Sequence, residues 1–197
     1  MELPAYALTW LAEEPAITAA RDRARKIGIP STSPDAGSLL RSLAQLVDAR
    51  TAVETGTGVG ISTLWLLSGM RPGATLTSID REPEYHRYAR QTFADAGVPA
   101  ARVRLISSEA ASVLPRLTEQ GYDLAHLDCG SAENATQYVQ MVRLVRPGGV
   151  VVVSGVFRNE GEGKALLELI AAEGDGGCTL LPVGEGVLIV SKPGHPA

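Results

Sequence analysis

Apolar residues in this chain fall into short runs that return at regular intervals between positions 51 and 192. Most of these runs are nearly continuous rather than alternating, which is typical of strands buried on both faces. They occupy residues 51–55, 74–80, 101–108, 122–128, 149–155, 179–183 and 186–192. The pattern therefore predicts a sheet of seven strands with helices covering both faces.

Helical patterns separate the first five runs, at residues 62–70, 82–97, 109–120 and 134–145, and a further one lies at 163–174. Strands that alternate with helices form parallel sheets with right-handed crossovers. The last two strands are joined only by residues 184–186, which predicts an antiparallel hairpin at one edge of the sheet. We expect a doubly wound, Rossmann-like α/β fold that is mostly parallel and ends in this antiparallel hairpin strand.

The segment before the first strand has helical character. Residues 16–29 are rich in alanine and arginine, which favour helices. Residues 33–50 open with Ser33-Pro34-Asp35, a sequence suited to a helix start, and then carry leucines at helical spacing. We therefore expect a single domain over residues 1–197, with N-terminal helices over 1–48 and a Rossmann-like core over 49–192.

The composition narrows the class of protein. A chain of 197 residues with 45% hydrophobic and 20% charged residues is globular rather than disordered. The net charge of −4 leaves no basic surface for nucleic acid, and no apolar run approaches the roughly 20 residues of a membrane span. The two cysteines, Cys129 and Cys178, are too far apart for a metal motif. We expect a cytoplasmic protein that acts on a small molecule.

Candidate chemistry is concentrated in residues 52–63, "AVETGTGVGIST", where the first predicted strand ends. A loop in this place is the usual ligand site of a doubly wound sheet. A dinucleotide loop needs the spacing G-x-G-x-x-G, but Ile61 stands where the third glycine belongs. Glu54 would also repel a pyrophosphate, whereas it suits a ligand with a cationic amine.

S-adenosylmethionine has these properties, since it carries an ammonium, a carboxylate and a sulfonium but no phosphate. The N-terminus of the next helix, together with Ser62, would meet the carboxylate. Asp80 ends the second predicted strand, where an acceptor for ribose hydroxyls is needed. The alternative is a structural glycine turn with a capping serine.

Several segments together resemble the class I S-adenosylmethionine-dependent methyltransferases, and more closely the bacterial O-methyltransferases related to catechol and caffeoyl-CoA O-methyltransferases. "VETGTGVGISTLWL" resembles that family's "LEIGTGxGYSTLxL", and "TSPDAGSLLRSLAQL" its "SPEQGQLL" helix. "LTSIDREPEYHRYAR" resembles the acid-ended second strand and its helix. "YDLAHLD" and "VRPGGVVVV" resemble the fourth and fifth strands, "YDLVFID" and "LRPGGxxxxDN". The resemblance runs from about residue 29 to 192.

The resemblance implies a cofactor site built from Thr32, Glu54, Gly56, Thr57, Gly58, Ser62, Asp80, Arg81, Ser108, Glu109, Ala110 and Asp128. Thr32 would lie near the methionine end, and Glu54 would anchor the loop and reach the cofactor. Asp80 would bind both ribose hydroxyls, while Arg81 and residues 108–110 would border the adenine. Asp128 would face the methyl group that is transferred.

The family's divalent metal site is not fully present. Its ligands are the acid that ends strand four and an Asp-Asn pair that ends strand five. Here the first is kept as Asp128, but Ser154-Gly155 replaces the pair, and Ser131 stands where the family has the lysine proposed as base. We therefore predict no metal. The open alternative is a rebuilt site with ligands from Glu133 and Asn134 or from Asn159 and Glu160.

Without a metal, another group must take the proton of the acceptor. His126 and Asp128 are two residues apart in a predicted strand and so share a face, which makes His126 a candidate base beside Asp128. The alternative is a hydrogen-bonded histidine in the core.

The acceptor pocket is expected to use the N-terminal segment and the loops 130–136 and 156–164. Tyr6 and Trp10 would cover the acceptor, or pack in the homodimer interface that the resemblance implies.

These inferences predict a metal-independent S-adenosylmethionine-dependent O-methyltransferase. One alternative is a catalytically inactive protein that binds S-adenosylmethionine or S-adenosylhomocysteine. The other is an NAD(P)-dependent oxidoreductase, which Ile61 and Glu54 disfavour.

Overall fold

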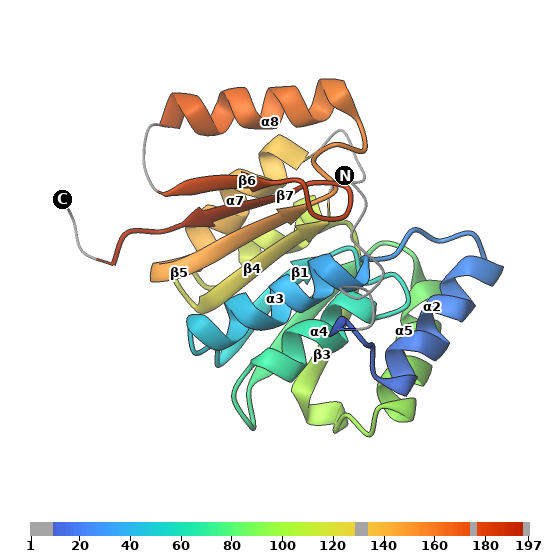
Figure 1. Ribbon diagram of the computed structural model, residues 1–197. Coiled ribbons are helices and arrows are strands. Elements are labelled where there is room, and N and C mark those ends of the chain that lie inside the picture. Colours follow the sequence, from blue (N-terminus) through green and yellow to red (C-terminus); the bar gives the residue numbers. More distant parts are fainter. Residues whose placement is uncertain (1–9, 129–133, 174–176, 195–197) are drawn as a thin grey trace.

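Seven strands form one sheet in the order β3-β2-β1-β4-β5-β7-β6 (Figure 1). The computed structural model describes residues 10–128, 134–173 and 177–194. The strands are β1 Thr51–Thr55, β2 Thr75–Asp80, β3 Val103–Ser107, β4 Tyr122–Asp128, β5 Val145–Ser154, β6 Cys178–Leu181 and β7 Val187–Ser191. β1 to β5 pair in parallel, and β7 pairs antiparallel with both β5 and β6. The predicted α/β sheet with an antiparallel C-terminal hairpin is confirmed.

Alternate residues along the strands serve two cores, one on each face of the sheet. On one face Val53, Ala125 and Val151 pack against α7 (Asn134–Leu144) and α8 (Glu160–Glu173). On the other, Ala52, Leu124 and Val152 pack against α3 (Pro34–Leu46) and α4 (Ile61–Gly69). Helix α2 (Pro15–Lys26) packs with α4 and α5 (Pro83–Asp95) in a third cluster. Burial on both faces explains why the strands are continuously apolar.

The predicted helix over residues 109–120 is much shorter in the structure. Helix α6 covers only Ala110–Val113, and a 3₁₀ turn, η2, follows over Leu114–Arg116. Pro115 lacks an N–H group and cannot continue the α-helical ladder. A second 3₁₀ turn, η1 (Ala100–Arg102), precedes β3. In the part of the chain that the structure describes, no helix is both long and apolar enough to cross a bilayer.

The strand order reverses direction beside β1, because β2 follows β1 on one side and β4 lies on the other. In open α/β sheets a crevice opens at this switch point, at the carboxyl ends of the strands. The loops after β1, β2 and β4 therefore converge there.

Candidate active site

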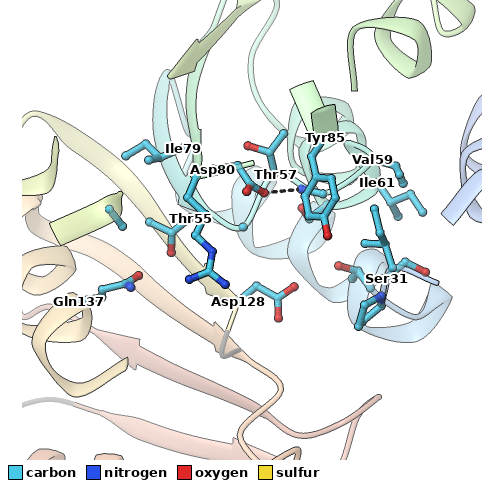
Figure 2. Close-up of a pocket in the computed structure, with 18 of the residues that line it drawn as sticks. Ser31, Thr55, Thr57, Val59, Ile61, Ile79, Asp80, Tyr85, Asp128 and Gln137 are labelled. Carbon is cyan, nitrogen blue, oxygen red and sulfur yellow. Dashed lines mark hydrogen bonds between the residues drawn. The ribbon is translucent and has the colours of Figure 1, made fainter. Parts of the chain in front are cut away.

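A pocket of about 460 Å³ lies at the carboxyl ends of β1, β2 and β4 (Figure 2). Eleven of the predicted site residues line it: Thr32, Gly56, Thr57, Gly58, Ser62, Asp80, Arg81, Ser108, Glu109, Ala110 and Asp128. Glu54 and His126 are not part of this lining. The structure thus brings the residues predicted from five separate loops to one cavity.

The glycine loop after β1 contains three positions whose backbone conformation favours glycine. Gly56, Gly58 and Gly60 all have positive φ, at 87°, 49° and 88°. A side chain at Gly56 would place its Cβ 3.1 Å from the Cβ of Asp128, and one at Gly60 would lie 2.7 Å from a ring carbon of Phe93. The loop therefore leaves its backbone open toward the pocket while α5 packs closely behind it.

Asp80 fixes this loop from the neighbouring strand. Its Oδ2 accepts a hydrogen bond from the Gly58 N–H at 3.0 Å, the contact dashed in Figure 2, and its Oδ1 accepts one from the Glu82 N–H at 3.0 Å. Each carboxylate oxygen can accept more than one hydrogen bond, so both retain capacity toward the pocket. The carboxylate is thus held in place with acceptor sites for a pair of hydroxyl groups.

Glu54 lies beneath the loop and has no exposed surface. Its carboxylate accepts hydrogen bonds from Ser62 at 2.9 Å, from Ser78 at 2.8 Å and from Thr63. Ser78 in turn is 2.6 Å from the hydroxyl of Thr57 in the loop. Glu54 therefore anchors the loop, as predicted, but its carboxylate does not reach the pocket in this structure, because its hydroxyl partners cover it.

His126 is also fully buried, two residues before the end of β4. Its Nε2 is 2.9 Å from the Ser154 hydroxyl, and its Nδ1 is 3.5 Å from a carboxylate oxygen of Glu54. A ring enclosed in this way cannot touch an acceptor in the pocket. The structure therefore places His126 in the position of the alternative, a core histidine hydrogen-bonded to Ser154 of β5, and not among the residues that line the pocket.

Asp128, at the end of β4, meets an arginine that sequence reasoning missed. Nη1 of Arg158 donates to Oδ1 of Asp128 at 3.2 Å, and both side chains line the pocket. Nε and Nη2 of the same arginine donate to Oε2 of Glu185, at 2.8 and 2.7 Å. Burial raises the pKa of Asp128 above its ordinary value, and the Arg158 charge offsets part of that rise.

The loop that carries Arg158 is tied to the C-terminal hairpin. The Gly155 and Val156 N–H groups donate to the Gly186 carbonyl, at 2.9 and 3.2 Å, and the Phe157 N–H donates to the Glu185 carbonyl at 2.8 Å. Across the hairpin, the Gly184 N–H donates to Asp35 of α3 at 3.1 Å. The pocket wall beside Asp128 is thus set by three elements that are distant in the sequence.

Comparison with known proteins decides the family. A family model described as a methyltransferase domain matches residues 53–154, which run from β1 and its loop to the end of β5. The chain belongs to this methyltransferase family. An O-methyltransferase by name from Mycobacterium sp. (strain JLS) is 42% identical to it over 200 residues, covering 95% of this chain and 91% of that protein.

Solved structures share the architecture of this methyltransferase. A protein of Corynebacterium glutamicum matches it with a TM-score of 0.87 and 26% identity, over 95% of this chain and 96% of that one. The O-methyltransferase TomG of Streptomyces achromogenes, involved in tomaymycin synthesis and crystallised with S-adenosylmethionine, matches with a TM-score of 0.82 and 27% identity. That match covers 92% of this chain and 91% of TomG.

The side chains at the family's metal position do not suit a divalent cation in this methyltransferase. Such ions need several oxygen ligands. Ser154 directs its hydroxyl at His126, Gly155 has no side chain, and Oδ1 of Asp128 is bonded to the cationic Arg158. No group of three or more His, Cys, Asp or Glu residues with metal-binding geometry occurs among residues 10–128, 134–173 and 177–194.

The alternative metal ligands do not change this picture where they are described. Oδ1 of Asn159 accepts the Glu162 N–H at 3.2 Å and so caps α8, while Glu160 is exposed in the first turn of that helix. Glu133, Ser131 and Cys129 lie outside the described residues, as does the side chain of Asn134. Metal independence remains a prediction.

The acceptor side is described only in part. Trp10 is 89% exposed, and Tyr6 and most of loop 130–136 lie outside the described residues. Of the predicted loop 156–164, Arg158 lines the pocket beside Asp128, while Glu160 already begins α8. The lining also contains residues that were not predicted individually as site residues: Ile29, Pro30, Ser31, Thr55, Val59, Ile61, Ile79, Tyr85, Gln137 and Arg158. Several of these residues are direct sequence neighbours of predicted site residues, so extending each predicted loop by a few positions would have included them.

Proposed function

We propose that this methyltransferase transfers a methyl group from S-adenosylmethionine to an oxygen of a small-molecule acceptor. The observation that carries the proposal is the single pocket that the glycine loop, Asp80 and Asp128 line together. The name of the mycobacterial relative and the complex of TomG with S-adenosylmethionine support the same cofactor and reaction.

The residues of the pocket fit this cofactor. Asp80 offers two fixed carboxylate oxygens to the ribose hydroxyls, and a Cβ-free backbone at Gly56 and Gly58 allows close approach. The N-terminus of α4, which begins at Ile61, directs free N–H groups toward a carboxylate. When bound, S-adenosylmethionine supplies an electrophilic methyl group, and its transfer to an acceptor hydroxyl releases S-adenosylhomocysteine and a proton.

The roles of the protein are to bind and to align. Methyl transfer from a sulfonium needs the acceptor oxygen in line with the breaking bond, and holding the two reactants together supplies much of the acceleration. Asp128 stands at the boundary between the glycine loop and the wall formed by Arg158, where the acceptor oxygen must enter. We propose that Asp128 orients that oxygen.

Calorimetry and a turnover assay test this function together. We expect S-adenosylmethionine and S-adenosylhomocysteine to bind and raise the melting temperature, and S-adenosylhomocysteine to be released when phenols or hydroxylated metabolites are added. Tight cofactor binding without turnover on any acceptor would favour the inactive binding protein. Stabilisation by NAD(P) alone would overturn the proposal in favour of an oxidoreductase.

We also propose that the protein is a cytoplasmic homodimer formed through its N-terminal segment. The exposed Trp10 and the free, exposed Cys178 are consistent with an interface near the N-terminus and with a reducing compartment. Light scattering of the wild type and of Trp10→Ala tests the dimer, and cell fractionation tests the location. A wild-type mass of about 20.7 kDa would exclude the dimer.

A further inference from the structure

A guanidinium stands at the end of the pocket where a metal would bring positive charge. Arg158 lies in the loop that follows Ser154, the last residue of β5, and its Nη1 lies 3.2 Å from Oδ1 of Asp128. The side chain is 29% exposed and lines the same cavity as the glycine loop. This methyltransferase therefore carries a permanent cation of its own beside the strand-four acid.

The position of this guanidinium is fixed from two sides. Two of its nitrogens donate to Glu185 in the C-terminal hairpin, and a third donates to Asp128. The backbone of the loop is also held, since the Arg158 N–H donates to the Gly155 carbonyl at 3.0 Å and the Phe157 N–H donates to Glu185. A cation held by so many contacts costs little reorganisation when a ligand arrives.

This arrangement disfavours the binding of a divalent ion at Asp128. A dication bound to Asp128 would share that carboxylate with Arg158, so two like charges would lie within a few ångströms of each other. The remaining oxygen ligands would also be missing, because Ser154 is directed at His126 and Gly155 has no side chain. The same geometry suits an acceptor oxygen, which could lie against Arg158 as an acceptor of its hydrogen bond.

We propose that Arg158 takes the place of the metal: its guanidinium donates a hydrogen bond to the acceptor oxygen and holds it beside Asp128. This assignment rests on the proposed O-methyltransferase function. It also names the substrate class. A metal selects two adjacent oxygens, because it chelates them, whereas one guanidinium nitrogen needs only one oxygen. The acceptor therefore needs only a single hydroxyl, as in a monophenol, and a vicinal second hydroxyl gives no advantage.

A matched pair of probes tests the assignment. EDTA-treated wild type is assayed for S-adenosylhomocysteine release with 4-nitrophenol and with 4-nitrocatechol, which differ by one vicinal hydroxyl. Arg158→Gln, Arg158→Lys and the control Arg25→Ala, which loses only an exposed pair with Asp22, are assayed alongside. We expect the monophenol to react at least as fast as the catechol. We expect Arg158→Gln to lose about 100-fold in kcat/KM, Arg158→Lys to lose less, and Arg25→Ala to match the wild type.

Binding measurements cover the case in which neither probe turns over. Calorimetric titration of 4-nitrophenol into the S-adenosylhomocysteine complex is expected to show at least tenfold weaker binding for Arg158→Gln than for wild type. The Kd of S-adenosylhomocysteine itself should change less than threefold. Equal probe binding by both proteins would overturn the assignment, as would a wild type that does not bind the probe.

Metal binding gives an independent test. Titration of Mn²⁺ into the wild-type S-adenosylhomocysteine complex should show no site of submillimolar affinity. Such a site, or activity that EDTA abolishes and Mg²⁺ restores, would overturn the role of Arg158 and leave the methyltransferase proposal intact. Failure to bind S-adenosylmethionine or S-adenosylhomocysteine would instead remove the proposed function itself.

Discussion

Replacement of Glu54 by glutamine tests the buried anchor beneath the glycine loop. The carboxylate accepts hydrogen bonds from three hydroxyls: Oε1 from Thr63 and Ser78, and Oε2 from Ser62. Glutamine has nearly the same shape, but one of its two terminal groups is an NH₂ that cannot accept. At least one hydroxyl therefore loses its acceptor, and two do if the NH₂ takes the place of Oε1.

The size of the effect follows from these bonds. A hydrogen bond to a charged group contributes about 1.5–3 kcal/mol, so loss of one or two of them costs about 3 kcal/mol. For a chain of this length, each kcal/mol lowers the melting temperature by about 2–4 °C. We therefore expect Glu54→Gln to melt about 6–12 °C below wild type. Its affinity for S-adenosylhomocysteine should also fall, because Thr57 in the loop is linked to Glu54 through Ser78.

At pH 7, scanning calorimetry gives the melting temperature, urea unfolding gives the free energy of unfolding, and titration calorimetry gives the affinity for S-adenosylhomocysteine. Glu168→Gln, the same substitution on the outer face of α8, is the control, and we expect its unfolding free energy to stay within about 0.5 kcal/mol of wild type. If Glu54→Gln melted within 1 °C of wild type, the three hydroxyls would not depend on the carboxylate, and the anchoring role would be refuted.

Three further changes test other contacts. Asp80→Ala should weaken S-adenosylhomocysteine binding by about 1–3 kcal/mol in calorimetry, and an unchanged Kd would disprove the ribose assignment. Burial raises the pKa of Asp123, but its hydrogen bonds outweigh this and leave the pKa below its usual value. The stability advantage over Asp123→Asn should thus be complete above about pH 5 and shrink as the pH falls below about 4; a constant difference in urea unfolding would contradict it. Gly60→Ala should lose more thermal stability than Gly73→Ala, because both have positive φ but only Gly60 meets Phe93, and equal losses would exclude a steric contribution.

Most of the residues predicted for the cofactor site line one pocket, because the signals that pointed to them are local. The glycines and Asp80 follow directly on strands that the apolar pattern identifies, and parallel strands bring their carboxyl ends to one edge. The seven strands and the C-terminal hairpin were predicted for the same reason. Pro115 gave a local signal too, which the prediction of one long helix over residues 109–120 neglected.

The acceptor end depends on contacts between distant segments. Arg158 acquires its role from Asp128 and Glu185, 30 and 27 residues away, and no spacing rule connects them. His126 shows a different limit. The alternation of side chains along a strand correctly places His126 on the same face as Asp128, but it does not say how far a residue lies from the edge of the sheet. His126 pairs with Glu54 and Val152 inside the sheet and is buried, whereas Asp128 reaches the pocket at the carboxyl edge.

The bonds between the Arg158 loop and the C-terminal hairpin have a consequence for how new substrates are acquired. Glu185 and Gly186 bond to the Arg158 loop, and Gly184 bonds in turn to Asp35, so the pocket wall beside Asp128 is connected directly to the turn between the last two strands. The residues proposed to bind the cofactor lie on the other side of the sheet order, in the loops after β1 and β2. Substitutions within residues 184–186 can therefore change the acceptor end of the pocket without altering the loops after β1 and β2.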